Sequence, residues 1–190
     1  MHIIGPPGAE GGSGATYTRW GRRTCPTSAQ LLYTGVAAGT GHHEEGGTVN
    51  YLCMPYNPQF KGQATTTNIP NGIEAVEYIL ESFPPTDGRH LYEMPCAVCF
   101  ITKAATFTQV GRYECPHDWT VEYTGYQMSD HIHGNRGGRT ESVCVDGELE
   151  GIGSSSHQGL SHITLTKSTN RGLPAAYGNG KIITCAVCSK

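Results

Sequence analysis

The sequence is poor in charge and has no long apolar run, and both shortages exclude broad classes of protein. Of its 190 residues, 15% are charged and 37% are hydrophobic, which is typical of neither a disordered charged tail nor a membrane protein. No stretch approaches the roughly 18 consecutive apolar residues of a transmembrane helix. The net charge is −3, and Arg19, Arg22 and Arg23 form the one small basic cluster. We therefore expect neither nucleic acid nor a membrane as a partner.

Recognisable catalytic motifs are also missing. The sequence contains no Gly-x-Ser-x-Gly elbow, no His-Glu-x-x-His pair and no phosphate-binding loop. The serines at 154–156 lie in a low-complexity stretch without an evident base. The sequence therefore predicts that the protein is not an enzyme.

Cysteine, in contrast, is abundant, with eight residues in the chain. An even and fairly dense set of cysteines is typical of an oxidising compartment, where thiols form disulfides. We expect a secreted protein.

A repeat of about 85–90 residues accounts for every cysteine. Each copy runs from Gly-Arg and Cys-Pro through Tyr-Thr-Gly and a single cysteine to Cys-Ala-Val-Cys. The cysteines of the two copies are Cys25, Cys53, Cys96 and Cys99, then Cys115, Cys144, Cys185 and Cys188. We divide the chain into a collagen-like tail (1–16) and two homologous tandem halves (17–103 and 104–190), which together make one compact domain.

Strand and turn patterns dominate both halves, so the predicted fold class is all-β and disulfide-rich. Residues 30–34 and 120–124 carry β-formers and are expected to end as strands at the following glycine. Residues 73–82 are the exception, because apolar side chains at helical spacing predict a short helix there.

Three interpretations compete for the Cys-x-x-Cys pairs. A thioredoxin-like redox pair needs a following helix, and only two residues follow Cys188. A four-cysteine zinc site would leave four matched cysteines unexplained. The favoured interpretation is two disulfides within each half, with each pair split between the first and second cysteines. The sequence leaves open which thiol joins which, and whether the halves exchange partners.

Glycine recurs at every third position from Gly5 to Gly14, with Pro6-Pro7 in the first triplet. This is the collagen period, in which only glycine fits the axis of the triple helix. The alternative is a flexible Gly/Pro/Ser linker.

Together these motifs resemble the C-terminal non-collagenous domain of the short-chain, spongin-type collagens of sponges and other invertebrates. The resemblance extends from Tyr17 to Lys190 and rests on residues 19–26, 50–55, 95–99, 115–126, 144–146 and 184–188. That family is thought to be distantly related to the C-terminal domain of type IV collagen. The resemblance implies a structural protein of the extracellular matrix that forms homotrimers and contacts collagen or other matrix components.

Two polar motifs are candidate metal sites. They lie at matching positions, His42 and His133 each standing eleven residues before a cysteine. The ligand candidates are His42, His43 and Glu44 in the first half and Asp130, His131 and His133 in the second. Such a set suits zinc or calcium, but the favoured interpretation is a polar turn without a cofactor.

The main functional alternative is a lectin-like, metal-assisted module that binds glycans. Aromatic side chains beside polar loops can stack on sugar rings, and the candidates are Trp20, Tyr56, Trp119 and Tyr126. For both tryptophans, packing in the core is the favoured interpretation.

Overall fold

The described residues fold almost entirely into β-strands joined by turns and loops. A computed structural model describes residues 13–44, 46–61, 71–80, 83–86, 88–131, 140–156, 160–169 and 171–190. The strands are β1 (Ala15–Trp20), β2 (Gln30–Gly39), β3 (Leu52–Pro55), β4 (Glu74–Tyr78), β5 (Pro95–Ile101), β6 (Thr106–Val110), β7 (Thr120–Ser129), β8 (Val143–Asp146), β9 (Ser161–Leu165) and β10 (Thr184–Ser189), with short 3-10 helices η1 (Pro84–Thr86) and η2 (Ala175–Tyr177). The predicted all-β, disulfide-rich class is confirmed. Neither of the described helices has the length and hydrophobicity that crossing a bilayer requires.

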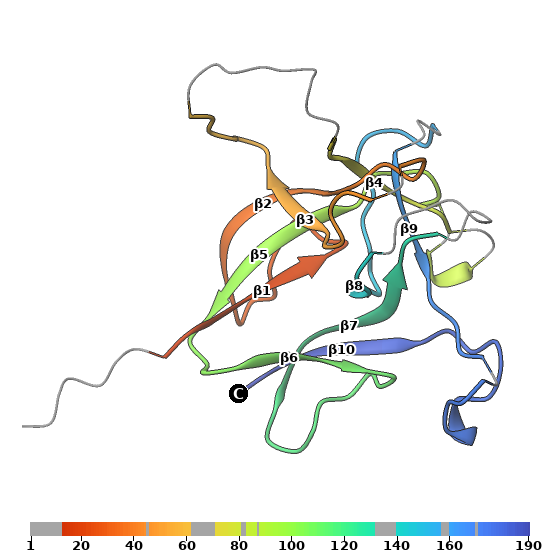
Figure 1. The fold of residues 1–190 in the computed structure, drawn as a ribbon. Coiled ribbons are helices and arrows are strands. Elements are labelled where there is room, and N and C mark those ends of the chain that lie inside the picture. Colours follow the sequence, from red (N-terminus) through yellow and green to blue (C-terminus); the bar gives the residue numbers. More distant parts are fainter. Residues whose placement is uncertain are drawn as a thin grey trace, which may run out of the picture.

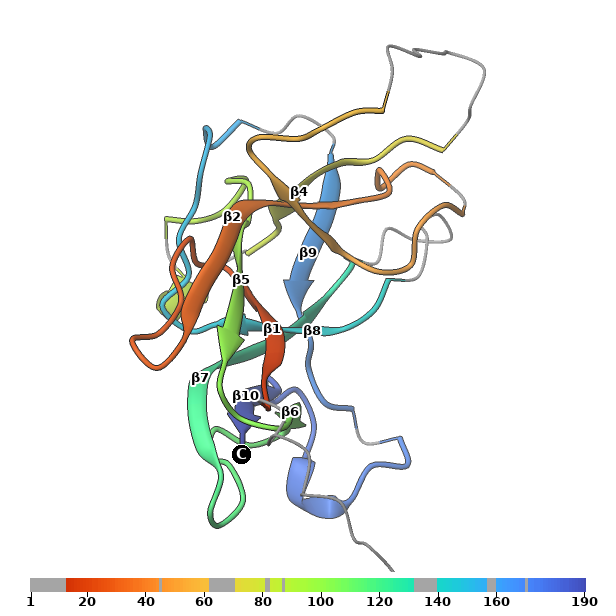
Figure 2. The ribbon, with the colours of Figure 1, turned by 90° about the vertical axis from the view of Figure 1, so that its left-hand side faces the viewer.

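The strand order is the same in the two halves. In the first half β1 pairs with β5, β5 with β2, and β2 with β3. In the second half β6 pairs with β10, β10 with β7, and β7 with β8. The halves meet through two parallel contacts, β1 with β8 and β4 with β9. Figure 1 shows β1, β2, β3 and β5 above β6, β7 and β10, and Figure 2 shows β4 beside β9.

The Tyr-Thr-Gly motifs do not end strands, contrary to the prediction. β2 and β7 continue for four residues beyond Gly35 and Gly125. Both glycines lie opposite a neighbouring strand, and a Cβ atom there would collide with the carbonyl oxygen of Met54 or of Val145. The motif therefore marks a close approach of two strands.

The predicted helix over residues 73–82 is also wrong. Residues 74–78 form β4, while residues 81 and 82 lie outside the described part of the chain. Glu77 and Tyr78 pair with His162 and Ile163 of β9, and both side chains are fully buried. Pairing with β9 thus outweighs the helical spacing of Ile73, Val76 and Leu80.

The two cysteines of each Cys-x-x-Cys motif lie on one strand and face opposite sides of it. Residues three apart on a strand point to opposite faces, because side chains alternate along it. On β5, Cys96 joins Cys53 of β3, whereas Cys99 joins Cys25 in the turn after β1. The second half repeats this pattern with Cys115–Cys188 and Cys144–Cys185. The predicted split of each pair is confirmed. All eight cysteines form disulfides, so the redox and zinc-site interpretations are wrong.

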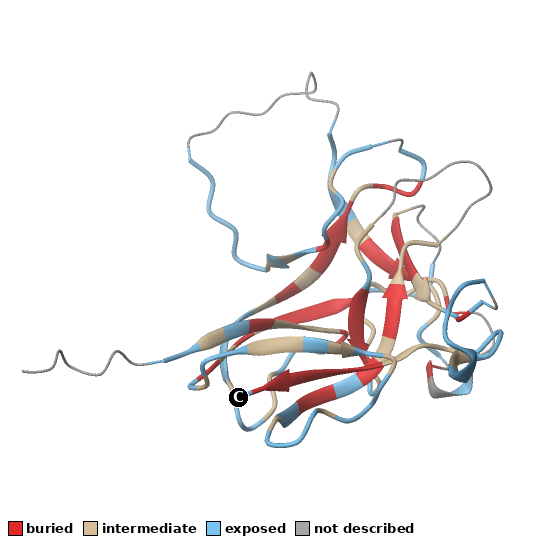
Figure 3. Cartoon of the chain, turned by 60° about the horizontal axis from the view of Figure 1, so that its bottom comes forward, coloured by how far each residue is buried: buried red, intermediate tan, exposed pale blue. Residues whose placement is uncertain are grey.

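The hydrophobic core draws on both halves. One cluster packs Tyr78 and Met94 of the first half against Met128 of the second. Another packs Ile101 against Tyr123 and other side chains of the second half. Figure 3 shows the buried residues running along the strands, with exposed residues mainly in the connections.

Charged side chains also tie the halves together. The small basic cluster contacts acids of the second half, with Arg19 Nη2 lying 2.7 Å from Asp146 Oδ2 and Arg23 Nε lying 3.0 Å from Glu150 Oε2. Both members of the Arg19–Asp146 pair are largely buried. The cluster therefore links the two halves.

Glu122 on β7 is a buried carboxylate that joins four other segments. It accepts hydrogen bonds from Tyr17, Ser28, Lys103 and Ser189, and Lys103 Nζ lies 3.3 Å from Oε1. Burial alone would raise the pKa of Glu122. The hydrogen bonds from Ser189, Ser28 and Lys103 outweigh burial, so the pKa lies below its ordinary value.

Removal of the Cys25–Cys99 disulfide should destabilise the fold strongly. The Cys25–Cys99 bond joins residues 74 apart. In the chain-entropy model, replacing both cysteines by alanine lowers the free energy of unfolding by about 4 kcal/mol, measured by urea denaturation. Peptide mapping under non-reducing conditions checks the pairing, and a cross-link between the halves would contradict the structure.

The free energy of unfolding should decrease as the pH is lowered, partly because Glu122 becomes protonated. Because its pKa is lowered in the folded state, the carboxylate stabilises the fold above its unfolded pKa of about 4.3, and this stabilisation is lost as pH falls through the folded value. Glu122→Gln should lower the free energy of unfolding by about 2 kcal/mol at pH 7. This variant should then lose less stability on acidification than the wild type. Glu114→Gln removes an exposed ion pair with Arg112 and serves as the control, with an expected change below about 0.5 kcal/mol.

Candidate functional site

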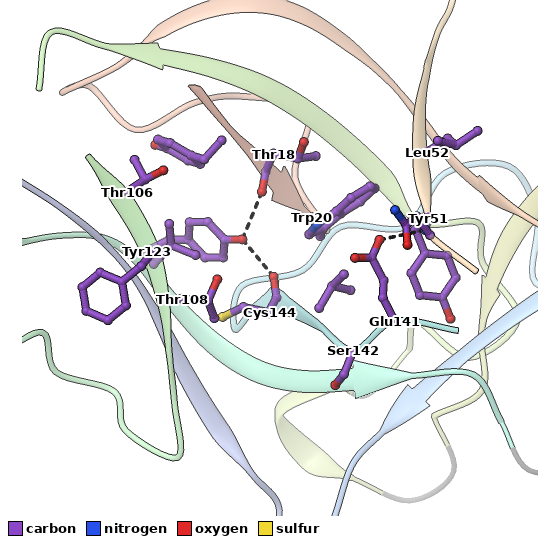
Figure 4. Close-up of a pocket in the computed structure, with 15 residues that line it drawn as sticks. Thr18, Trp20, Tyr51, Leu52, Thr106, Thr108, Tyr123, Glu141, Ser142 and Cys144 are labelled. Atoms are coloured by element: carbon purple, nitrogen blue, oxygen red, sulfur yellow. Dashed lines mark hydrogen bonds between the residues drawn. The ribbon is translucent and has the colours of Figure 1, made fainter. Parts of the chain in front are cut away.

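A cavity opens where β1 and β8 separate. These two strands pair at Trp20 and Val145, and a cleft of about 430 Å³ lies beside this point. It is lined by residues of β1, β3, β6, β7, β8 and β10 and by the segments just before β3 and β8. In Figure 4, Trp20, Tyr51 and Glu141 lie toward one end of the cleft, and Thr106, Thr108 and Tyr123 toward the other. We refer to this cavity as the seam cleft.

Tyr123 holds the two walls of the seam cleft in place. Its hydroxyl lies 2.8 Å from the carbonyl oxygen of Cys144 on β8 and 3.3 Å from that of Thr18 on β1. A side chain thus bridges the strands where backbone pairing stops. Burial raises the pKa of Tyr123 well above its ordinary value, so the hydroxyl keeps its proton.

The seam cleft combines aromatic rings with neutral polar groups and one carboxylate. Trp20 meets Tyr51 edge to face, with ring centroids 6.4 Å apart. Glu141 Oε1 accepts the backbone N–H of Tyr51 at 2.9 Å, which fixes the carboxylate at the cleft wall. Glu141 is the one charged residue among the described residues that line this cleft.

The structure brings the two predicted metal motifs together, around a residue that the sequence did not single out. The ring of His162 on β9 stacks on that of His42 with centroids 3.9 Å apart, and the ring of His131 lies 6.5 Å from it. The ring of His43 is tilted against that of His42, with centroids 3.6 Å apart. No local pattern singles out His162, because its neighbours Ser161 and Ile163 are buried as well and its position depends on the pairing of β9 with β4.

The surroundings of these rings are buried and polar. His42 Nδ1 lies 2.7 Å from the carbonyl oxygen of Leu160, and His162 Nε2 lies 3.8 Å from Glu77 Oε2. Burial raises the pKa of Asp130 above its ordinary value, although the backbone N–H of His131 partly offsets this. The stacked rings and this carboxylate form a polar core beneath the β4–β9 contact.

The metal prediction stays open. Within the described ranges, no three His, Cys, Asp or Glu side chains are placed to hold a metal ion. Glu44 is exposed, and His133 lies outside the described residues. The rings of His42 and His162 stack face to face, an arrangement that does not direct their nitrogens to one point.

The four aromatic residues considered for sugar binding do not form one surface. Trp20 packs partly against the core and lines the seam cleft. Trp119 packs edge to face on Phe107, and Tyr126 on Phe83. Tyr56 is exposed. Of the four, only Trp20 belongs to the seam cleft.

Comparison with known proteins adds no family assignment, because no protein-family model matches the chain.

The bridge formed by Tyr123 can be tested against its counterpart in the other half. Tyr123→Phe removes the hydroxyl shared by two buried carbonyl groups and should lower the free energy of unfolding by about 1–2 kcal/mol. Tyr33→Phe is the matched control, because Tyr33 donates only to Cys53 and is half exposed, and it should cost less. Equal losses in the two variants, measured by urea denaturation, would contradict the bridging role.

Proposed function

We propose that this chain is the C-terminal, trimer-forming domain of a short-chain collagen of the extracellular matrix. The role is mechanical: three copies associate and align three chains in register. Four disulfides within the halves are compatible with a secreted protein. The collagen-like triplets of residues 5–16 support the proposal from the sequence, and residues 1–12 lie outside the described part of the chain.

The main support is an uncovered apolar face on the first half. On β8 of the second half, Val143 and Val145 are 7% and 0% exposed, and Val145 lies where β1 of the first half pairs with this strand. Their counterparts on β3, Leu52 and Met54, are 39% and 37% exposed and point to the same side of the strand. We call the side of the first half that carries these two residues the β2–β3 face.

A second copy is the partner that best fits this face. The matched positions are apolar in both halves, and in one half a segment of the same protein already covers them. The first half carries further exposed apolar side chains on β2 and after β3, namely Leu31, Leu32, Tyr33, Tyr56 and Phe60. Large exposed apolar patches are typical of protein–protein contacts.

A ring of three copies follows if the face meets a different surface of its neighbour. Such a head-to-tail contact closes when the rotation between copies divides a full turn, and a threefold ring suits three collagen chains. Bringing the three chain ends together removes much of the entropic cost of starting the triple helix. Collagen or other matrix components are the expected further partners.

Light scattering tests the proposal directly. The wild type should have three times the chain mass of 20.4 kDa at micromolar concentration. Met54→Glu puts a charge on the β2–β3 face and should give the mass of a single chain. Leu173→Glu changes an exposed apolar residue outside this face and should leave the trimer intact. A wild type that stays a single chain, with an unchanged circular dichroism spectrum, would refute the proposal.

A further inference from the structure

Apart from Leu52, which also belongs to the β2–β3 face, the seam cleft is lined by residues that the assembly role does not require. Its rigid walls come from two strands bridged by Tyr123, and its volume of about 430 Å³ lies within the range of small-molecule sites. The hydroxyls of Thr18, Thr106 and Thr108 and the amide of Asn50 line it together with the rings of Trp20 and Phe107. An apolar ligand would leave these polar groups without partners, so the cleft suits a ligand with both ring faces and polar edges.

Charge and hydrogen-bonding capacity narrow the ligand class. Glu141, the one charged group of the described lining, repels anions, so sulfated or uronic-acid polysaccharides do not suit the cleft. A proline-rich strand such as Gly-Pro-Pro offers carbonyl acceptors and few donors, and a carboxylate needs donors. Sugar hydroxyls both donate and accept hydrogen bonds, so one sugar can bind Glu141, Asn50 and the threonines together.

The aromatic residues supply the remaining part of a sugar site. Trp20 is partly exposed at the cleft while its edge contact with Tyr51 holds the ring in place. The apolar face of a pyranose ring packs on such a fixed aromatic ring. The Glu141 carboxylate is also fixed, by the backbone N–H of Tyr51 at 2.9 Å, so little freedom is lost when a hydroxyl binds it.

We propose that the seam cleft binds a neutral saccharide, with Glu141 accepting hydroxyl hydrogen bonds and Trp20 contacting the ring face. Binding needs no metal ion and no second copy of the chain. The site differs from the aromatic set suggested by the sequence, since Tyr56, Trp119 and Tyr126 take no part. The protein would then attach to neutral glycans in addition to assembling.

Titration by NMR tests the proposal. The probes are methyl glycosides of glucose, galactose, mannose and N-acetylglucosamine and their disaccharides, at millimolar concentration and with EDTA present. At least one should shift the indole N–H signal of Trp20 and leave that of Trp119 unchanged; Trp119→Phe assigns the two signals.

Substitutions at the wall test the assigned contacts. Glu141→Gln keeps an oxygen for the Tyr51 N–H and should weaken binding about tenfold. Thr108→Val should weaken binding several-fold. Thr120→Val, an exposed threonine of β7 away from the cleft, is the matched control and should not change it. Binding that is unchanged in both cleft variants would overturn the proposal.

Further binding measurements distinguish this proposal from the assembly role. Titration of Met54→Glu, which is expected to stay a single chain, should give the same affinity as the wild type. Binding to the variant but not to the wild type would mean that copies cover the cleft, and would overturn the proposal. Binding of heparin alone, or of a Gly-Pro-Pro repeat peptide alone, would overturn it as well.

Discussion

Two thiols on opposite faces of one strand are the constraint on which the structure depends. β5 lies between β1 and β2, and β10 lies between β6 and β7, so each carries a Cys-x-x-Cys motif at the centre of its half. One thiol fixes β3 or β8, which lies on the far side of β2 or β7, and the other fixes the turn before β2 or β7. A single strand is thus bonded on both faces, and the sheet around it has little freedom to slip in register.

The two halves share this plan but differ in what surrounds them. β1 of the first half crosses to β8 of the second, and this one contact buries Val145, creates the seam cleft and brings Arg19 to Asp146. The equivalent position on the first half stays uncovered. Both proposed roles come from this asymmetry: the uncovered β2–β3 face supports assembly, and the incompletely closed seam provides the cleft.

The fold class and the split of the cysteine pairs could be predicted because they depend on spacing within the sequence. Strand alternation also predicts the split, since Cys96 and Cys99 must face opposite ways once their segment is a strand, but it does not predict which of the two joins Cys25. The strand at 74–78 could not, because its partner β9 lies more than 80 residues away and local apolar spacing resembles that of a helix. The seam cleft and the place of His162 depend in the same way on distant strand pairings that no local pattern encodes.

The nested disulfides determine how the protein bears tension. A pull applied between the two ends passes through β1, crosses from Cys25 to Cys99, follows the chain to Cys115 and crosses again to Cys188. Residues 26–98 and 116–187 lie off this covalent path. The main element that force can peel away is β1, because its pulled end at Ala15 lies opposite Ile101, the end at which the path leaves β5, so their six residue pairs can open one after another. Tension applied to the chain before β1 would therefore detach β1 first, while the disulfide-bonded remainder of the domain stays folded.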